Sequence, residues 1–164
     1  FNGKTPQIAP TAFISEAAYV IGDVQIGENS SVWPGAVIRG DFASIRIGNN
    51  SQIEDNCVVH GAGSIVIGDN VHIGHGAVIH CLRIGNNVLI GMKATLLDNV
   101  VIGNSCVVAA NSLVSPGMRI ADDSFVAGVP AKVKGKTTSA QMVLVEKGVK
   151  GYVTLGLQCK RQGL

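Results

Sequence analysis

Branched apolar residues recur at every sixth position over most of the chain. This period matches neither the 3.6-residue repeat of a helix nor the 8- to 12-residue spacing of hairpin strands. It is typical of a β-solenoid, in which each hexapeptide forms one flat side and three sides close a coil of about 18 residues. The two longest series are Ile8, Ile14, Val20, Ile26, Val32 and Ile38, and Ile84, Ile90, Leu96, Ile102, Val108, Val114, Ile120 and Val126. The pattern therefore predicts an all-β solenoid of hexapeptide repeats with these side chains inside.

The six-residue period stops near Val126, and a different pattern follows. Gly128-Val129-Pro130-Ala131 is expected to close the solenoid, and the lysines after it to form a solvated connector. From Thr138 onward the spacing favours a C-terminal α-helical segment along one side of the prism. Internal glycines, which each cost about 1 kcal/mol in a helix, leave two short helices as an alternative. We expect a β-helix domain at 1–130 and a connector with a helical tail at 131–164.

Irregular intervals in the series fix which positions stack on the same side of the prism. The column through Ile38 is continued, three sides later each time, by Val59 and Ile79. Because successive side chains of a strand point to opposite faces, the residues that directly follow these three stack on the outside. They are Arg39, His60 and His80. Adjacent strands lie about 4.8 Å apart, which is close enough for two imidazoles to share one zinc ion.

A third histidine, His75, belongs to the preceding side and stacks on Asp55 near a corner. It points away from the side that carries His60 and His80. As a metal ligand it therefore comes most simply from a neighbouring subunit, and a three-fold assembly would give one site per interface. Three histidines leave a fourth coordination position open, as in catalytic zinc sites, and Fe(II) or Co(II) would also suit them.

The fourth histidine, His72, stacks on Gln52 and falls outside the column of His60 and His80. We expect it to be an exposed polar residue on an outer face, without a part in the site. On this view His80→Ala loses metal and activity together, whereas His72→Ala loses neither.

Charge and composition exclude several classes of function. A net charge of +2 on 164 residues gives no surface for nucleic acid or for a membrane. The sequence has no apolar run of about 18 residues and no charged start before an apolar segment. Its four cysteines form no C-x-x-C pair, so they are expected to be reduced and partly buried in a cytoplasmic protein. Cys57 and Cys106 fall in small inward positions of the repeat.

Over about residues 5–135 the sequence resembles the gamma-class carbonic anhydrases of the hexapeptide-repeat superfamily. The motifs are Arg39-Gly40-Asp41, Glu54-Asp55-Asn56-Cys57-Val58-Val59-His60, Gly74-His75-Gly76-Ala77-Val78-Ile79-His80 and Ala127-Gly128-Val129-Pro130-Ala131-Lys132. The resemblance implies a left-handed parallel β-helix and a homotrimer with metal sites shared between subunits. It also implies reversible hydration of CO2 to bicarbonate by a metal-bound hydroxide, with His60, His75 and His80 as zinc ligands.

The resemblance implies roles for further residues as well. Arg39 and Asp41 would form an ion pair between subunits that orders the site, and Asp55 would lie beside the ligands. Glu54 stands where the family usually has a glutamine. The two glutamates that shuttle protons in the archaeal type are replaced by Phe42 and an uncharged loop. Glu54 is therefore the nearest carboxylate for the proton-transfer step.

Two other functions remain open on the sequence. A hexapeptide acyltransferase would use acyl-coenzyme A and one histidine as general base, but it does not explain why His60 and His80 stack. A metal- or anion-binding homologue with weak catalysis would explain why the shuttle glutamates are missing.

Overall fold

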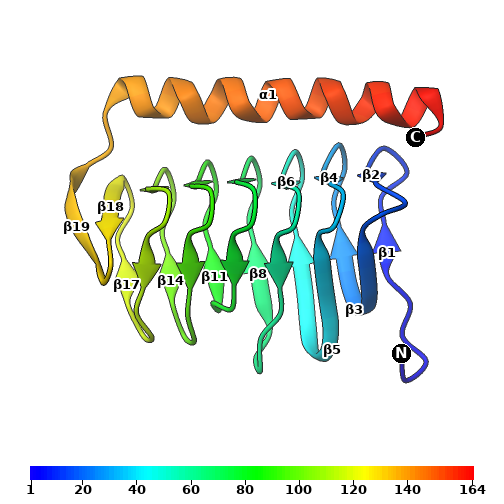
Figure 1. Ribbon diagram of the computed structural model, residues 1–164, viewed down its shortest axis with the longest axis horizontal. Helices are drawn as coiled ribbons and strands as arrows, with labels where there is room; N and C mark the ends of the chain where they lie inside the picture. Colours follow the sequence, from blue (N-terminus) through cyan, green and yellow to red (C-terminus); the bar gives the residue numbers. More distant parts are fainter.

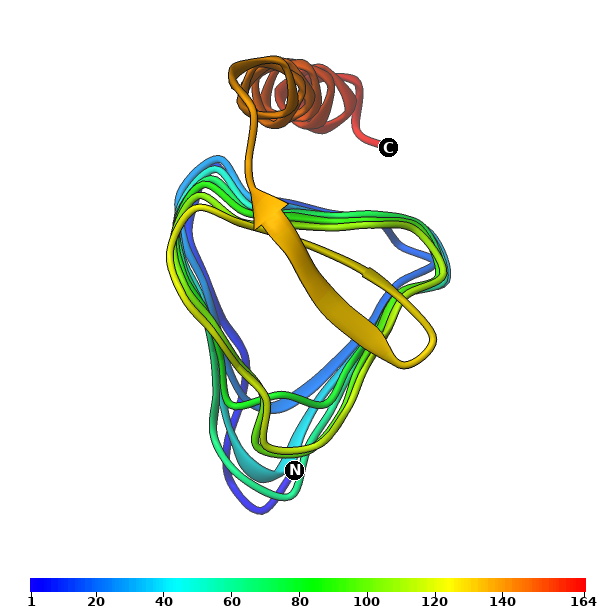
Figure 2. The ribbon, with the colours of Figure 1, turned by 90° about the vertical axis from the view of Figure 1, so that its left-hand side faces the viewer.

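Short parallel strands wind around a triangular prism, and one long helix lies along one side of it (Figures 1 and 2). The computed structural model describes the whole chain, Phe1–Leu164. It is a left-handed parallel β-helix with a single C-terminal α-helix, so the predicted fold class is confirmed.

The three sides of the prism are named here by what lies on them. The helix face is the side covered by α1 (Ser139–Gln162), and its strands are β2 (Phe13–Ile14), β4 (Ser31–Val32), β6 (Gln52–Ile53), β9 (His72–Ile73), β12 (Leu89–Ile90), β15 (Val107–Val108), β18 (Ser124–Gly128) and β19 (Ala131–Lys136). The β7 face consists of the first parts of β3 (Tyr19–Ile26) and β5 (Val37–Ile47), with β7 (Val58–Val59), β10 (Val78–Ile79), β13 (Thr95–Leu96) and β16 (Leu113–Val114). The β8 face consists of β1 (Gln7–Ile8), the last parts of β3 and β5, β8 (Ile65–Ile67), β11 (Arg83–Ile84), β14 (Val101–Ile102) and β17 (Arg119–Ile120).

Pairing between coils follows the register that the hexapeptide period predicts. On the β7 face Ile38 pairs with Val59, and Val59 pairs with Ile79. On the helix face Ile53 pairs with Ile73. The inward residues therefore stack in columns and form one core cluster of 31 buried residues. The outward residues next to them must follow the same register, which is what positions the candidate site.

The cysteines lie as the repeat predicts. Cys57, Cys81 and Cys106 are buried, Cys159 on α1 is partly exposed, and all four thiols are free. Burial raises the pKa of the Cys57 thiol to about 12. Cys57 and Cys106 therefore fill inward positions of the core and have no reactive character.

The last coil is closed by a strand, where the sequence predicted a solvated connector. β19 pairs antiparallel with β18, so the chain reverses at Val129-Pro130 and covers the open end of the helix face. An open strand edge presents unpaired backbone groups, and β19 satisfies them while its lysines stay exposed. The expectation of solvated lysines is thus correct, and the connector that carries them is a strand.

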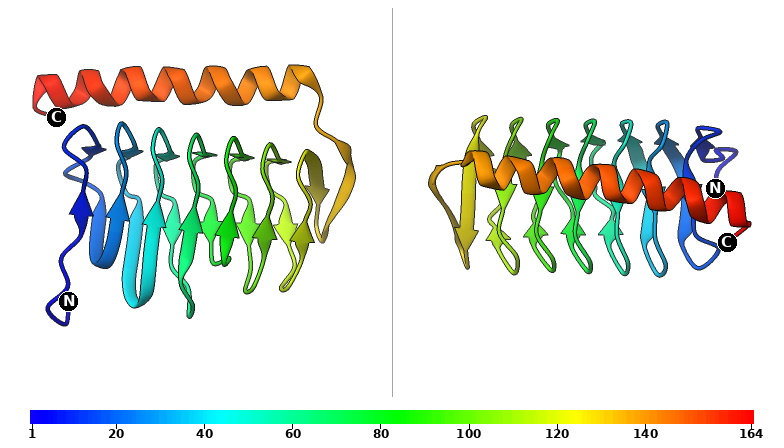
Figure 3. Two further views of the ribbon diagram at one scale, coloured as in Figure 1. Left: turned by 180° about the vertical axis from the view of Figure 1, so that it is seen from behind. Right: turned by 90° about the horizontal axis from the view of Figure 1, so that it is seen from above.

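α1 runs back along the prism, so that its C-terminal end lies over the first coils (Figure 3). Its N-terminus is capped by Thr138, whose side chain accepts the backbone N–H of Gln141 while the Gln141 side chain accepts the N–H of Thr138. Val145 and Val149 are buried against Val107 of the helix face. The segment is therefore one helix and not two. It does not combine the length and the hydropathy that a membrane-crossing helix needs.

Candidate metal centre

His60 and His80 lie side by side on the outside of the β7 face. Each directly follows a strand, β7 or β10, and these strands pair in register, so the two side chains come from successive coils. Their ring centroids are 5.8 Å apart and the rings meet edge to face. The predicted stacking of these two histidines is confirmed.

A carboxylate holds the His60 ring. Asp41 Oδ1 lies 3.1 Å from His60 Nε2, and Asp41 Oδ2 accepts a hydrogen bond from Arg39 Nη1 at 2.5 Å. Partial burial disfavours the charged form of Asp41, but the Arg39 guanidinium and hydrogen bonds from the backbone and His60 outweigh it and lower the pKa of Asp41. In the single chain, Arg39 and Asp41 thus pair with each other.

His80 has a partner that the sequence analysis missed. Asp98 Oδ1 lies 3.1 Å from His80 Nδ1. Leu96 pairs with Ile79, the residue before His80, and Asp98 follows Leu96 by two residues. The register of the repeat therefore places Asp98 in the coil next to His80 and could have predicted this contact. Because Nδ1 is engaged, Nε2 is the ring nitrogen that His80 has left for a metal ion.

His75 and Asp55 form the predicted column at the corner between the helix face and the β7 face. Asp55 Oδ2 lies 2.9 Å from His75 Nδ1, and Glu54 Oε2 lies 3.0 Å from His75 Nε2. The His75 side chain is 44% exposed, so it can reach a neighbouring molecule. Within one chain, no three histidine, cysteine, aspartate or glutamate side chains come together as a metal site.

Glu54 is almost completely buried, with 1% of its surface exposed. Its carboxylate contacts His72 Nε2 at 2.5 Å, and it accepts the backbone N–H of His75 at 2.9 Å. Burial raises its pKa, but hydrogen bonds and charge from His72, with Tyr152 and His75, outweigh burial, so the pKa of Glu54 is lowered. Glu54 is therefore a buried carboxylate that stays ionised at neutral pH.

The expectation for His72 is wrong in one respect. It does stack on Gln52, as the register predicts. It is not exposed, however, because α1 covers it: the Tyr152 ring lies 5.2 Å away, edge to face, and the His72 side chain is 14% exposed. The hexapeptide period cannot reveal which side of the prism the helix will cover, so the burial of His72 had no signal in the repeat.

The donor set has the character of a zinc site. Neutral imidazoles are zinc ligands, and metal-ligating histidines are commonly oriented by a carboxylate on the other ring nitrogen. Each of the three predicted ligands has such a carboxylate. The pairs are His60 with Asp41, His75 with Asp55, and His80 with Asp98. The residues therefore fit a metal ion when the corner of one copy is brought to the β7 face of another.

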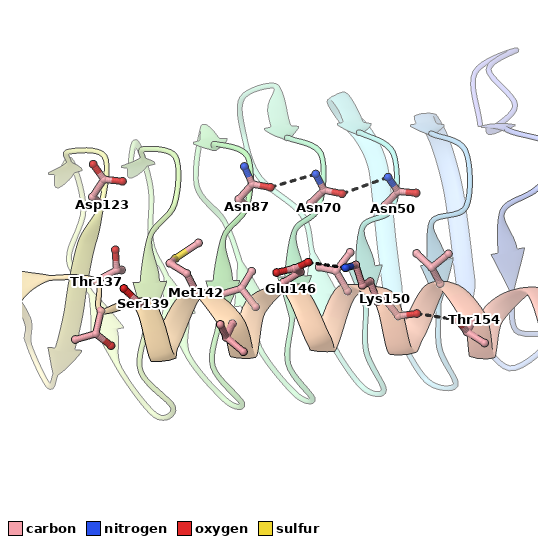
Figure 4. A pocket seen from close by; sticks show the side chains of 15 residues that line it. Asn50, Asn70, Asn87, Asp123, Thr137, Ser139, Met142, Glu146, Lys150 and Thr154 are labelled. Atoms are coloured by element: carbon pink, nitrogen blue, oxygen red, sulfur yellow. Dashed lines mark hydrogen bonds and ion pairs between the residues drawn. The ribbon is translucent and has the colours of Figure 1, made fainter.

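A large groove lies between α1 and the corner where the β8 face meets the helix face (Figure 4). Its volume is about 1030 Å³. One wall is a ladder of asparagines, in which Asn50 Nδ2 donates to Asn70 and Asn70 Nδ2 donates to Asn87, at 3.2 and 3.1 Å. The other wall is α1 with its Glu146–Lys150 ion pair. None of the predicted site residues lines this groove, because they lie on the β7 face and at its corner with the helix face.

Comparison with known proteins agrees with the fold. The family described as "Bacterial transferase hexapeptide (six repeats)" matches residues 5–40 and 82–116. "Gamma carbonic anhydrase 2, mitochondrial" from Arabidopsis thaliana is 42% identical over 93% of the chain, although the chain spans only 58% of that relative's length. "Carnitine operon protein CaiE" from Escherichia coli is 34% identical over 97% of the chain and 82% of its own length.

A solved structure from Bacillus cereus, described as a putative acetyltransferase, has the same fold. It superimposes with a TM-score of 0.95 at 34% identity, covering 99% of this chain and 95% of that one. The matches to the two relatives and to this structure cover 93–99% of the chain. The chain therefore belongs to the hexapeptide-repeat family and, within it, to the gamma carbonic anhydrase-like proteins.

Proposed function

We propose that this protein catalyses the reversible, metal-dependent hydration of CO2 to bicarbonate, at sites shared between the subunits of a homotrimer. The observation that carries the proposal is the His60/His80 pair on the β7 face. Each ring has one nitrogen on a carboxylate and the other free, and the two rings come from adjacent coils. Relatives named gamma carbonic anhydrases support the same activity.

His60 and His80 of one copy would hold the metal together with His75 of a neighbouring copy. When bound, zinc supplies a water of lowered pKa, about 7, as the nucleophile for CO2. Both nitrogens of the His75 ring are engaged within the single chain, so one contact must be released. Asp55 can keep Nδ1, and Nε2 becomes available when Glu54 Oε2 gives it up.

Glu54 would accept the proton that each turnover releases. Its carboxylate is ionised at neutral pH, and Oε2 lies against the ring nitrogen that His75 would offer to the metal. An amide at this position accepts hydrogen bonds but cannot take up a proton near neutral pH. Glu54 is thus our candidate for the role of the missing shuttle glutamates, while Arg39, fixed on Asp41, would favour the bicarbonate anion or order the interface.

The test is metal analysis of anaerobically purified protein together with a stopped-flow assay of CO2 hydration on the same sample. We expect about one zinc, Fe(II) or Co(II) ion per chain and hydration above the buffer rate. His80→Ala should lose the metal and the activity together. Lys147→Ala, a matched control on the exposed side of α1, should keep both. Metal without hydration would point instead to a binding protein with weak or no catalysis.

A second candidate is acyl transfer from acyl-coenzyme A. The observation that favours it is the close likeness to the Bacillus cereus structure described as a putative acetyltransferase. In that reaction one of the histidines would act as general base toward an acceptor hydroxyl or amine. Purified protein without metal that binds acetyl-coenzyme A in calorimetry would favour this function over CO2 hydration.

A further inference from the structure

Glu54 is the single charged side chain among the buried residues. Every other buried polar residue is a serine or glutamine. A buried carboxylate is costly unless hydrogen bonds and charge compensate it. Here the two carboxylate oxygens are divided between two histidines: Oε1 contacts His72 Nε2, and Oε2 contacts His75 Nε2.

His72 itself is held in place by α1. The Tyr152 ring packs edge to face against the His72 ring. Gly148 lies over the same ring so closely that a Cβ there would be 2.5 Å from His72 Nδ1. His72 Nδ1 has no hydrogen-bond partner. Nε2 is the ring nitrogen that faces Glu54, so its N–H donates to Glu54 Oε1.

We propose that His72 is a positioning residue for Glu54, and that α1 is thereby a part of the site. By holding Oε1, His72 keeps the carboxylate in place, so that Oε2 would stay beside the His75 ring at the corner after its contact with Nε2 is released to the metal. Without His72, the contact at Oε1 would be lost, and the backbone N–H of His75 would hold Oε2 by a single bond about which the carboxylate can turn. This inference rests on the proposed function, in which Oε2 serves the reaction.

The test is a double-mutant cycle in the full-length, metal-loaded protein, with His72→Phe, Glu54→Gln and the double variant. Phenylalanine fills the space under Tyr152 but donates no hydrogen bond. We expect His72→Phe to lower kcat roughly 10- to 100-fold at unchanged KM and unchanged metal content. In the Glu54→Gln background the same change should have no further effect, because the residue it acts through is gone. His72→Gln, whose amide nitrogen can donate to Oε1, should restore most of the rate.

A second readout does not depend on turnover. The visible spectrum of the Co(II)-loaded protein should change in His72→Phe, recover in His72→Gln, and be the same in Glu54→Gln and the double variant. An equal fall in kcat and an equal spectral change in both backgrounds would show that His72 acts independently of Glu54 and would overturn the inference. An unchanged kcat and spectrum in a folded His72→Phe protein would overturn it as well. If wild type binds Co(II) and shows this coupling but hydrates no CO2, the proposed function fails and the positioning role stands.

Discussion

At the scale of single residues, each predicted ligand is oriented by a neighbouring carboxylate, and Asp98 is the one that is easiest to test. It is half exposed and contacts only the His80 ring among the candidate ligands. Asp98→Ala should weaken zinc binding roughly 10- to 100-fold, because His80 would lose the group that fixes its ring and tautomer. Asp98→Asn should lose less, since the amide oxygen still accepts from Nδ1. Competition with a chelator measures both, and equal affinity in all three proteins would contradict the role of Asp98.

The four thiols should differ sharply in reactivity. Burial raises the pKa of both Cys57 and Cys81 to about 12, and it raises the pKa of Cys106 as well. The thiolate is the reactive form, so these three should not react in the native protein at pH 8. A chromogenic thiol reagent should count one reactive thiol natively and four after unfolding. Cys159→Ser should abolish the native reaction, and a remaining fast thiol would mean that the core opens.

The positions of single residues could be predicted only as far as the repeat determines them. The register placed His60 over His80 and Asp55 over His75, because a parallel solenoid repeats the same pairing in each coil. The same register places Asp98 beside His80, although the sequence prediction did not include Asp98. The burial of His72 and its contact with Glu54 depend on the helix, whose place on the prism no periodicity encodes. The same limit applies to any residue that the helix covers.

At the scale of elements, the glycines of α1 make a matched pair for testing how closely the helix packs. A Cβ on Gly148 would be 2.5 Å from the His72 ring, whereas a Cβ on Gly151 would meet nothing within 4 Å. Alanine favours a helix over glycine by about 1 kcal/mol. Gly151→Ala should therefore raise the free energy of unfolding by up to about 1 kcal/mol. Gly148→Ala should lower it by roughly 1–3 kcal/mol, because the overpacked ring or the helix must shift. Denaturant titrations compare the two, and stabilisation by both would show that the helix is not seated on His72.

A second ladder lies at the corner between the β8 face and the helix face, where the side chains of Asp69, Asn86, Asn104 and Asp122 each accept a backbone N–H of the preceding coil, and it should respond to acid at Asp122. Its Oδ1 accepts the backbone N–H of Asn104 at 2.8 Å, and hydrogen bonds from the Asn104 backbone and side chain lower the pKa of Asp122 below its usual 3.8. A folded-state pKa below the unfolded one gives stability that is present above pH 3.8 and is lost as the pH falls through the folded value. Asp122→Asn keeps an acceptor but no charge. Thermal midpoints of the variant should therefore fall less than those of wild type between pH 5 and pH 2, and parallel curves would contradict this.

At the scale of the whole molecule, the hexapeptide period was enough to predict the solenoid, its three sides and its core, because one spacing specifies every coil. The closing strand β19 was not predictable in this way. It carries lysines at alternate positions, which reads as a solvated segment, and it becomes a strand because β18 offers an open edge. The proposed assembly cannot be derived from the period either, since a single prism keeps His75 apart from the His60/His80 pair.

Subunit complementation tests the proposal that the site is shared between subunits. His75→Ala chains retain His60 and His80 on the β7 face, and His80→Ala chains retain His75 at the corner. Neither variant alone should bind zinc or hydrate CO2. The two variants are unfolded together in equal amounts and refolded. An interface then has all three histidines only when its β7 face comes from a His75→Ala chain and its corner from a His80→Ala chain. Each has a probability of one half, so about a quarter of the interfaces should be intact. We expect metal content and activity near that fraction of wild type, and separately refolded variants mixed afterwards should stay inactive. Refolded mixtures without recovery, under conditions in which wild type refolds and regains activity, would contradict a site shared between subunits.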